Sequence, residues 1–265
     1  MRNLNLPQAL IEFKKAGLKF AFVIQGGNQG DQMIYAGAEK MAELLGISHT
    51  THYCLAPPNN PNIPQFDEQT VIYMHGGGGF NRWWAWSPKL LRLLRDRNPK
   101  NHIIVGPSTF ELDKGYLKSK LPSDIVYFTR EFSSYEYLKP LLPYIHIDHD
   151  TALHLSLGDG YLDRLLGFRQ PSMKHRLLAI RGDVESAKLP TGIKAELFNK
   201  IVDPCVEKDW AGLHLDASII VTNRCHSAIL GCLLRKRTVM FAGSYHKNKS
   251  IWEYSLKERG VEWLE

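Results

Sequence analysis

The sequence predicts an α/β fold built from two Rossmann-like domains that face a central cleft. Short strand patterns, rich in β-branched and other apolar residues, alternate repeatedly with helical patterns. Several strand patterns run into glycine or polar residues, as at residues 26–31 and 222–223. A break at residues 167–174 is a candidate linker. We therefore expect an N-terminal domain at 1–168 and a C-terminal domain at 169–265.

The predicted N-terminal domain opens with an amphipathic helix at residues 6–16. Leu10, Phe13 and Ala16 share one face of this helix and are expected to point inward. The later segments follow either the strand or the helix period. They are strand 20–24, helix 32–45, strand 71–74, helix 88–97, strand 102–105, strand 124–128, helix 133–141 and strand 144–150.

Two glycine-rich segments of this half are candidate binding loops. Residues 25–31 lie between a strand and a helix, where backbone amides can approach an anion. For the glycines taken alone we favour a tight turn between the two elements, and Asp31 is a good N-cap in either case. Four consecutive glycines at 76–79 indicate close approach to another segment or to a ligand. We expect Arg82 and the tryptophans after it to line the same cleft, with core packing as the alternative for the rings.

Cationic side chains follow two neighbouring strands of the predicted C-terminal domain. Arg224 and His226 lie at the start of a helix, where backbone N–H groups and the helix dipole favour an anion. His246, Lys247 and Lys249 follow the next strand in a loop. Because ligands of open parallel sheets bind outside the carboxyl ends of the strands, these side chains are expected to meet at one anion. The elements of this domain are strand 176–180, strand 218–221, helix 228–234 and strand 238–241.

Composition and charge limit the functional classes. A chain of 265 residues with 44% hydrophobic residues can bury a full core, and no apolar run approaches the ~20 residues that span a bilayer. The N-terminus lacks the apolar segment of a signal peptide, so we expect a cytoplasmic protein. A net charge of +6 suits an anionic substrate, an anionic membrane surface or nucleic acid, but no nucleic-acid-binding module is recognisable. The four cysteines lack C-x-x-C spacing and are expected to be free thiols.

The segment at residues 146–150 contains side chains that a divalent metal accepts. His146, Asp148 and Asp150 would share one face of an extended strand. A strand end whose carboxylates cap the next helix and hydrogen-bond at the domain junction explains the same residues, and we favour it. We therefore predict no metal and no cofactor.

Several short motifs resemble, in order along the chain, those of the polysaccharide pyruvyl transferase family. The segment TNRCHSAILGCLLRKRTVMFAGSYHKNKSIW is similar to its T-D-R-x-H and S-Y-x-K-N signature, with Asn223 in place of Asp and Ser227 in place of Gly. The matches span residues 26–252. The others resemble a G-N-x-G-D motif at 27–31, a glycine run at 76–79, a strand-end P-Q-S at 106–108, an R-E-x-x-S motif at 130–134 and an R-x-D-x-E motif at 181–185.

The resemblance implies a GT-B-like pair of domains and an enzyme that moves a pyruvyl group from phosphoenolpyruvate onto two hydroxyls of a sugar. The acceptor would be a polysaccharide or its precursor and the product a cyclic ketal, with phosphoenolpyruvate as donor substrate and no cofactor. His226 would act as general acid or base, and Arg224 would clamp the donor's carboxylate or phosphate. The residues expected to bind substrate are Lys247, Asn28, Asp31, Gly77, Gly78, Arg82, Ser108, Arg130, Arg181, Ser244 and Tyr245.

Two other functions stay open at this stage. A GT-B-type glycosyltransferase with a nucleotide-sugar donor would use the same cations at a helix N-terminus. A non-catalytic carbohydrate-binding protein of this fold is the other, given the departures at Asn223 and Ser227. The sequence specifies neither the acceptor sugar nor whether a lipid carries it. Basic residues such as Lys14 and Lys15 suit peripheral association with the inner face of the membrane as well as a solvated helix face.

Overall fold

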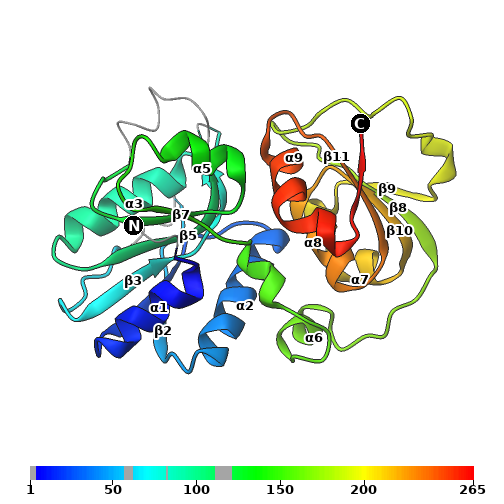
Figure 1. Ribbon diagram of the computed structural model, residues 1–265. Helices are drawn as coiled ribbons and strands as arrows, with labels where there is room; N and C mark the ends of the chain where they lie inside the picture. Colours follow the sequence, from blue (N-terminus) through cyan, green and yellow to red (C-terminus); the bar gives the residue numbers. More distant parts are fainter. Residues whose placement is uncertain (1–3, 57–61, 82, 111–120) are drawn as a thin grey trace. The chain divides into compact units, whose positions relative to one another are not determined.

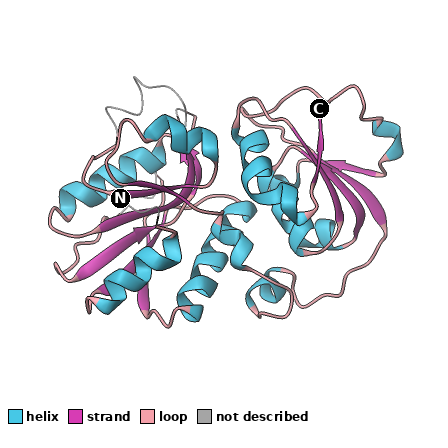
Figure 2. Ribbon diagram, in the orientation of Figure 1, coloured by secondary structure: helices cyan, strands magenta, loops and turns pink. Residues whose placement is uncertain are grey.

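The chain forms two compact α/β units. The computed structural model describes residues 4–56, 62–81, 83–110 and 121–265, and Figures 1 and 2 show their helices and strands. Unit 1 comprises Met1–Gly27 and Ala38–Thr151. Unit 2 comprises Asn28–Gly37 and Ala152–Glu265.

Unit 1 is built on a seven-stranded sheet whose strand pairs run parallel. Its strands are β1 (Lys19–Ile24), β2 (His49–Tyr53), β3 (Thr70–Met74), β4 (Gly77–Phe80), β5 (Ile103–Phe110), β6 (Val126–Thr129) and β7 (Ile145–Ile147). They follow the order β2-β1-β3-β5-β6-β7, with β4 beside β5. The strand order therefore reverses between β1 and β3, which is where doubly wound sheets bind ligands.

Helices cover both faces of this sheet because successive strand residues point to opposite sides. The helices that contribute are α1 (Leu6–Lys15), α2 (Gln29–Leu44), α3 (Trp86–Arg97) and α5 (Phe132–Leu138). Val71 and Tyr73 of β3 pack in a core with α1 and α2, whereas Ile72 and Met74 pack in a second core with α3 and α5. Within the described part of the chain, no helix combines the length and the apolar composition that crossing a membrane requires.

Unit 2 repeats this plan on a five-stranded parallel sheet. Its strands are β8 (His175–Ala179), β9 (Lys200–Val202), β10 (Ala217–Thr222), β11 (Arg237–Phe241) and β12 (Glu262–Leu264), and its helices are α6 (Tyr161–Leu165), α7 (Trp210–Leu215), α8 (Cys225–Leu233) and α9 (Lys247–Ile251). The strand order is β12-β11-β10-β8-β9, so it reverses between β8 and β10. Single helical turns lie at Thr151–His154, Ala195–Leu197, Pro204–Val206, Trp252–Leu256 and Lys257–Arg259.

The division between the units falls at Thr151 and Ala152, earlier than the 168/169 boundary expected from sequence. The reason is hydrophobic packing. Leu155 and Leu162 lie in the same buried core as Trp210 and Leu230 of unit 2. The first residues of α2 also belong to unit 2, because Met33 packs in that core.

The expected parallel α/β, Rossmann-like architecture is confirmed, and a few local expectations are wrong. Leu10 is buried as expected, together with Leu6 and Ala9, but Ala16 is exposed because α1 ends at Lys15 and Ala16 is its C-cap residue. Part of the glycine run forms the short strand β4 rather than a loop. The close approach that the glycine run predicted is confirmed, because a Cβ built on Gly76 would lie only 2.1 Å from the carbonyl oxygen of Pro107.

A buried histidine makes unit 2 sensitive to acid. His214 of α7 is fully buried, its Nδ1 lies 2.8 Å from the carbonyl oxygen of Trp210, and burial lowers its pKa to about 4. As the pH falls, His214 therefore takes up a proton in the unfolded chain before it does so in the folded chain. The folded state keeps its full stability above about pH 6.5 and loses stability as the pH falls toward 4. We expect this preferential protonation of the unfolded state to lower the unfolding free energy by about 3 kcal/mol over this range. Urea denaturation of wild type and His214→Gln at pH 7 and pH 4 checks this, and equal pH dependence in both would contradict it.

Candidate functional site

The candidate site lies at the carboxyl ends of β8 and β10, where the strand order of unit 2 reverses. Arg181 and Asp183 follow β8, and Arg224 follows β10 as the N-cap residue of α8. His226 lies in the first turn of α8. The chain topology therefore gathers side chains that are more than 40 residues apart in sequence.

Polar side chains fix the backbone at these strand ends. The hydroxyl of Thr222 donates to the carbonyl oxygen of Ala179 at 2.7 Å and accepts from the backbone N–H of Arg224 at 2.9 Å. Asn223 accepts from the backbone N–H of Arg181 at 2.8 Å through its side-chain oxygen. An aspartate at position 223 could accept the same hydrogen bond.

Asn248 ties the ends of β10 and β11 together. Its side-chain amide donates to the backbone carbonyls of Asn223 at 2.7 Å and Phe241 at 3.1 Å, and the Asn248 side chain is buried. Asn248→Ala would leave both carbonyls without this donor, and we expect the unfolding free energy to fall by about 2–3 kcal/mol. Urea denaturation checks this value. The control is Asn199→Ala, which removes a hydrogen-bond acceptor on an exposed residue and should lower the unfolding free energy by less than about 1 kcal/mol. Equal losses in the two variants would contradict the role of Asn248 in holding the strand ends together.

Two carboxylates hold the guanidinium of Arg224. Its Nη2 lies 2.5 Å from Asp203 and 3.2 Å from Asp183, and the residue is only 6% exposed. Both ion pairs use the same nitrogen. The buried Nε has no hydrogen-bond partner among the described residues. Arg224 is thus fixed in position while part of its hydrogen-bonding capacity is unused.

A third carboxylate, Glu185, pairs with the other two cations of the site, Arg181 and Lys247. Glu185 pairs with Arg181 at 2.9 Å and also with Lys247, which lies over the ring of Tyr245 at 5.1 Å. Arg181 in turn binds Asp183 through Nε and Nη2 at 2.9 and 2.8 Å. Asp183 therefore links the pairs of Arg181 and Arg224 into one network.

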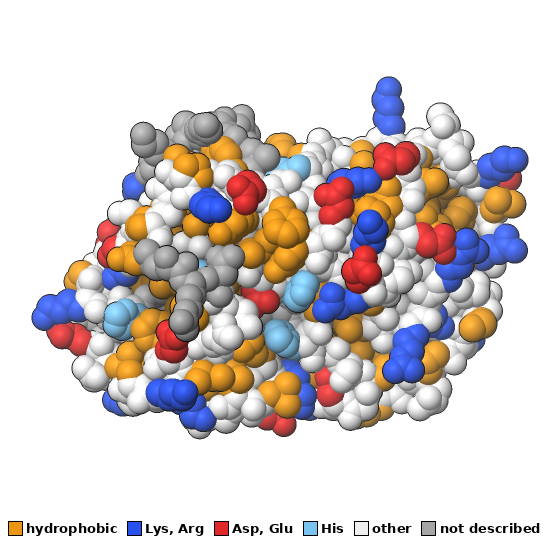
Figure 3. Space-filling model, viewed as in Figure 1, with side chains coloured by type: hydrophobic (Ala, Val, Ile, Leu, Met, Phe, Trp, Pro, Cys, Tyr) orange, Lys and Arg blue, Asp and Glu red, His pale blue; other side chains and the backbone are white. Residues whose placement is uncertain are grey.

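The network carries as many negative as positive side chains. Its cations are Arg181, Arg224 and Lys247, and its carboxylates are Asp183, Glu185 and Asp203. Burial opposes ionisation of Asp183 and Asp203, but hydrogen bonds from Arg181 and Arg224 outweigh it, lowering the pKa of Asp183 to about 2 and that of Asp203 below its ordinary value. Both are charged at neutral pH. On the face in Figure 3, acidic and basic side chains of unit 2 are likewise interspersed.

The first turn of α2 contributes to this side of unit 2. Asn28 and Asp31 cap the helix reciprocally: the backbone N–H of Asn28 donates to Asp31 at 2.8 Å, and the Asn28 side chain accepts from Gly30 at 2.8 Å. The ring of His226 lies directly against Gly30. Asn28 and Asp31 are therefore local capping residues next to the glycine that contacts His226.

The segment after β11 divides into two groups. Ser244 is exposed and Tyr245 half-buried, and Lys247 joins the ionic network from the first position of α9, which replaces the expected loop. Lys249 does not join it. Its Nζ pairs with Glu265 at 2.8 Å and lies over the rings of Trp252 and Trp263.

Four of the site residues predicted in the first half lie in unit 1: Gly77, Gly78, Ser108 and Arg130. Ser108 is buried within β5 and donates to the carbonyl oxygen of Gly106 at 2.8 Å. Arg130 is 1% exposed and pairs with Asp150 at 2.7 Å inside the same unit. Its expected contact with substrate stays a prediction. Gly77 and Gly78 lie in β4. Arg82 lies outside the described residues.

The carboxylates of Asp148 and Asp150 make structural contacts within unit 1, with α1 and Arg130, whereas the expected capping of the next helix stays a prediction. Asp148 accepts from the backbone N–H of Leu6 at 2.7 Å, at the start of α1, and Asp150 pairs with Arg130. No group of three or more potential metal ligands gathers among the described residues. The tryptophans after Arg82 are not fully in the core: Trp83 and Trp84 are 40% and 44% exposed.

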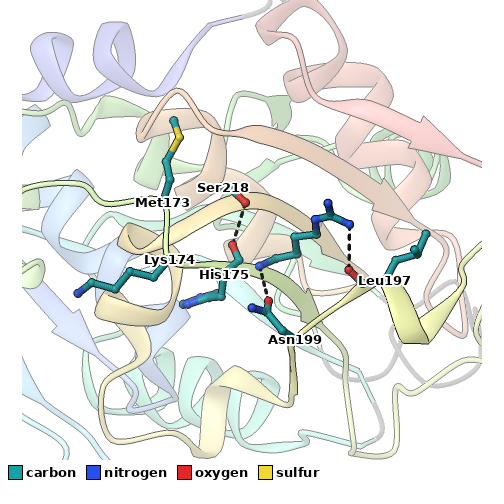
Figure 4. Close-up of a pocket in the computed structure, with 7 residues that line it drawn as sticks. Met173, Lys174, His175, Leu197, Asn199 and Ser218 are labelled. Carbon is teal, nitrogen blue, oxygen red and sulfur yellow. Dashed lines mark hydrogen bonds between the residues drawn. The ribbon is translucent and has the colours of Figure 1, made fainter.

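A separate hollow lies at the amino ends of the strands of the unit 2 sheet, whereas the candidate site lies at their carboxyl ends (Figure 4). Its polar groups are already engaged. Arg176 donates to the carbonyl oxygen of Leu197 at 3.3 Å, Ser218 donates to that of His175 at 2.9 Å, and Lys174 pairs with Asp216 at 3.1 Å. Its position and its hydrogen bonding give it no role in the site at the carboxyl ends.

Sequence reasoning missed the carboxylates that organise the site. Asp183 and Glu185 were noted only within the R-x-D-x-E motif, and Asp203 was not identified. Asp203 follows β9, the strand beside β8, so its place after a strand end was an available signal. Gly30 was noted within its glycine motif, but its contact with His226 joins distant segments and had no local signal.

The sequence matches no protein-family model and no curated protein. Its structure is similar to the crystal structure of a functionally uncharacterized protein from Klebsiella pneumoniae subsp. pneumoniae NTUH-K2044. The two chains share 17% sequence identity, the match covers 99% of each, and the TM-score is 0.73. At this identity the similarity shows the fold alone.

Proposed function

We propose that this protein is an enzyme that transfers a pyruvyl group from phosphoenolpyruvate to two hydroxyls of a sugar, in a polysaccharide or its precursor. The observation that carries the proposal is that the start of α8 holds both Arg224, its N-cap residue, and His226, in its first turn. They lie at the point where the strand order of unit 2 reverses. The ordered motifs from residue 26 to residue 252 support the same function.

The reaction requires acid–base chemistry and fixed cations but no redox step. A proton adds to the CH₂ carbon of phosphoenolpyruvate, and the cationic C2 carbon that results is attacked by one sugar hydroxyl. The bond from C2 to the phosphate oxygen breaks, phosphate leaves, and the second hydroxyl closes the ketal. The two hydroxyl protons balance the proton gained by carbon and the proton taken up by phosphate. One residue near the reacting carbon must therefore move protons.

The residues of the site divide these tasks. His226 is the proposed general acid and base, since imidazole exchanges protons near neutral pH. Arg224, with its unused Nε donor, is the proposed clamp for the donor's carboxylate or phosphate. Lys247 and Arg181 would add charge, although Glu185 neutralises part of it. The carboxylates preserve the geometry of the cations before the donor binds, which reduces reorganisation in the transition state.

The proposal extends to parts of the molecule beyond this network. It includes a GT-B-like arrangement of the two Rossmann-like units, with Ser244, Tyr245, Asn28 and Asp31 near the substrates. It also places the protein in the cytoplasm, with the inner face of the membrane as the location if a lipid carries the acceptor.

The test is product formation from phosphoenolpyruvate and a panel of acceptors. The purified chain is incubated with phosphoenolpyruvate and the methyl glycosides of galactose, glucose and mannose, or their disaccharides. Phosphate is followed by ³¹P NMR and products by mass spectrometry. We expect phosphate release that depends on the acceptor, and a product carrying one pyruvyl ketal. Transfer from nucleotide sugars without reaction of phosphoenolpyruvate would contradict the proposal and indicate a glycosyltransferase; sugar binding without turnover of either donor would indicate a carbohydrate-binding protein.

A further inference from the structure

The backbone of Gly30 in α2 lies directly against the side chain of His226. A Cβ built on Gly30 would lie 2.4 Å from Nδ1, 2.7 Å from Cγ and 2.8 Å from Cβ of His226. All three distances are far below van der Waals contact, so any larger residue at this position requires a shift of the histidine or of a helix. Gly30 is buried, and both residues belong to unit 2.

Space is the reason for glycine at this position. Gly30 lies in the first turn of α2 and its φ is outside the left-handed region, so the backbone there accepts any L-residue. Alanine is the better helix former. Helix propensity therefore favours alanine, and the contact with His226 opposes it.

Rotation of the imidazole cannot relieve the contact. The histidine Cβ itself would be only 2.8 Å from the new methyl group, and its position is set by the backbone of α8. That backbone is held on both sides of His226 by the buried residues Cys225 and Ser227. Met33 of α2 packs in the same core as Cys225, so the first turns of the two helices are fixed against each other.

We propose that Gly30 is a positioning residue for His226: the first turn of α2 forms the surface against which the imidazole is oriented. The segment Asn28–Gly37 thus completes a site whose other residues come from the second half of the chain. The consequence for catalysis depends on the function proposed above, whereas the positioning itself does not. The tests below separate the two.

The first test is a double-mutant cycle on thermal stability, which needs no activity. The variants are Gly30→Ala, His226→Gly and the double variant in the full-length chain. We expect Gly30→Ala to lower the melting temperature in the wild type but to leave it unchanged or raise it when His226 is glycine, because the contact is gone and alanine favours the helix. The same loss in both backgrounds would overturn the proposal. Gly192→Ala is the matched control, since a Cβ there meets its nearest neighbour at 3.8 Å, and it should leave the melting temperature and the spectrum of His226 unchanged.

The second test observes the imidazole directly. Histidine side-chain NMR signals are recorded for wild type, Gly30→Ala and Gly192→Ala, with His226→Gly to assign the resonances. We expect Gly30→Ala to shift the His226 signals and their pH titration, whereas Gly192→Ala should not. An unchanged His226 spectrum in Gly30→Ala would overturn the positioning role.

Kinetics then connect the contact with the proposed reaction. If phosphoenolpyruvate is turned over, Gly30→Ala should lower kcat by at least about 10-fold and change the pH profile, while KM for phosphoenolpyruvate changes by less than about 3-fold. An unchanged kcat and pH profile would overturn the catalytic consequence. Absence of turnover in the wild type would instead refute the proposed function, and the melting cycle and NMR spectra would still decide the role of Gly30.

Discussion

Replacing Arg130 by methionine should lower the unfolding free energy by about 3–5 kcal/mol. Arg130 and Asp150 are both 1% exposed, their side chains pair at 2.7 Å, and Arg130 Nε donates to the hydroxyl of Thr109 at 2.9 Å. The substitution leaves the carboxylate of Asp150 buried without its cationic partner. Urea denaturation of wild type and variant at pH 7 measures the loss.

The controls separate a buried pair from an exposed one. Arg130→Met combined with Asp150→Leu should recover most of the loss, because no unpaired charge remains buried. Arg169→Met breaks the pair with Asp209, which forms at 2.7 Å between side chains that are 44% and 63% exposed, and should cost below about 1 kcal/mol. Similar losses for Arg130→Met and Arg169→Met would show that the buried pair does not stabilise unit 1 as described.

Replacing Arg224 by lysine should reduce kcat/KM for pyruvyl transfer by about 100-fold or more. Lysine keeps the charge that Asp183 and Asp203 require, so the variant should fold, but it lacks the planar fork that binds a carboxylate or phosphate through two nitrogens. Steady-state rates over a range of phosphoenolpyruvate concentrations measure the effect.

The matched control for Arg224 lies at the other edge of the same sheet. Arg176→Lys makes the same chemical change in the hollow at the amino ends of the strands and should leave kcat/KM unchanged. Wild-type kcat/KM in Arg224→Lys would exclude Arg224 as the donor clamp. An equal loss in both variants would indicate a general effect of arginine removal rather than a contact with the donor.

The architecture was predictable because it depends on local patterns. Continuous apolar runs such as 71–74 mark strands buried on both faces, and the structure places Val71 to Met74 alternately in two cores. The position of Arg224 at the start of a helix followed from the strand end at Thr222 and Asn223. Strand order was not predicted, since it depends on contacts between segments far apart in sequence.

Pairing between distant side chains accounts for what the sequence did not predict in the site. A run of cations after a strand predicts positive charge, but Asp203 and Glu185 come from other strand ends and neutralise it. Lys249 has the same local pattern as Lys247, yet it lies two residues further along α9, about half a helical turn, and pairs with Glu265. Arg130 is buried against Asp150, a partner that no local pattern specifies.

The most direct test of the central claim, that the start of α8 binds phosphoenolpyruvate, is a thermal-melt titration of the purified chain. Phosphoenolpyruvate is compared with UDP and sulfate, for wild type, Arg224→Lys and Arg176→Lys. A ligand that binds only the folded state raises the melting temperature by an amount that grows with the logarithm of its concentration above Kd. We predict a rise that is specific to phosphoenolpyruvate, lost in Arg224→Lys and retained in Arg176→Lys. A rise with UDP alone, or no response to phosphoenolpyruvate in the wild type, would contradict the claim.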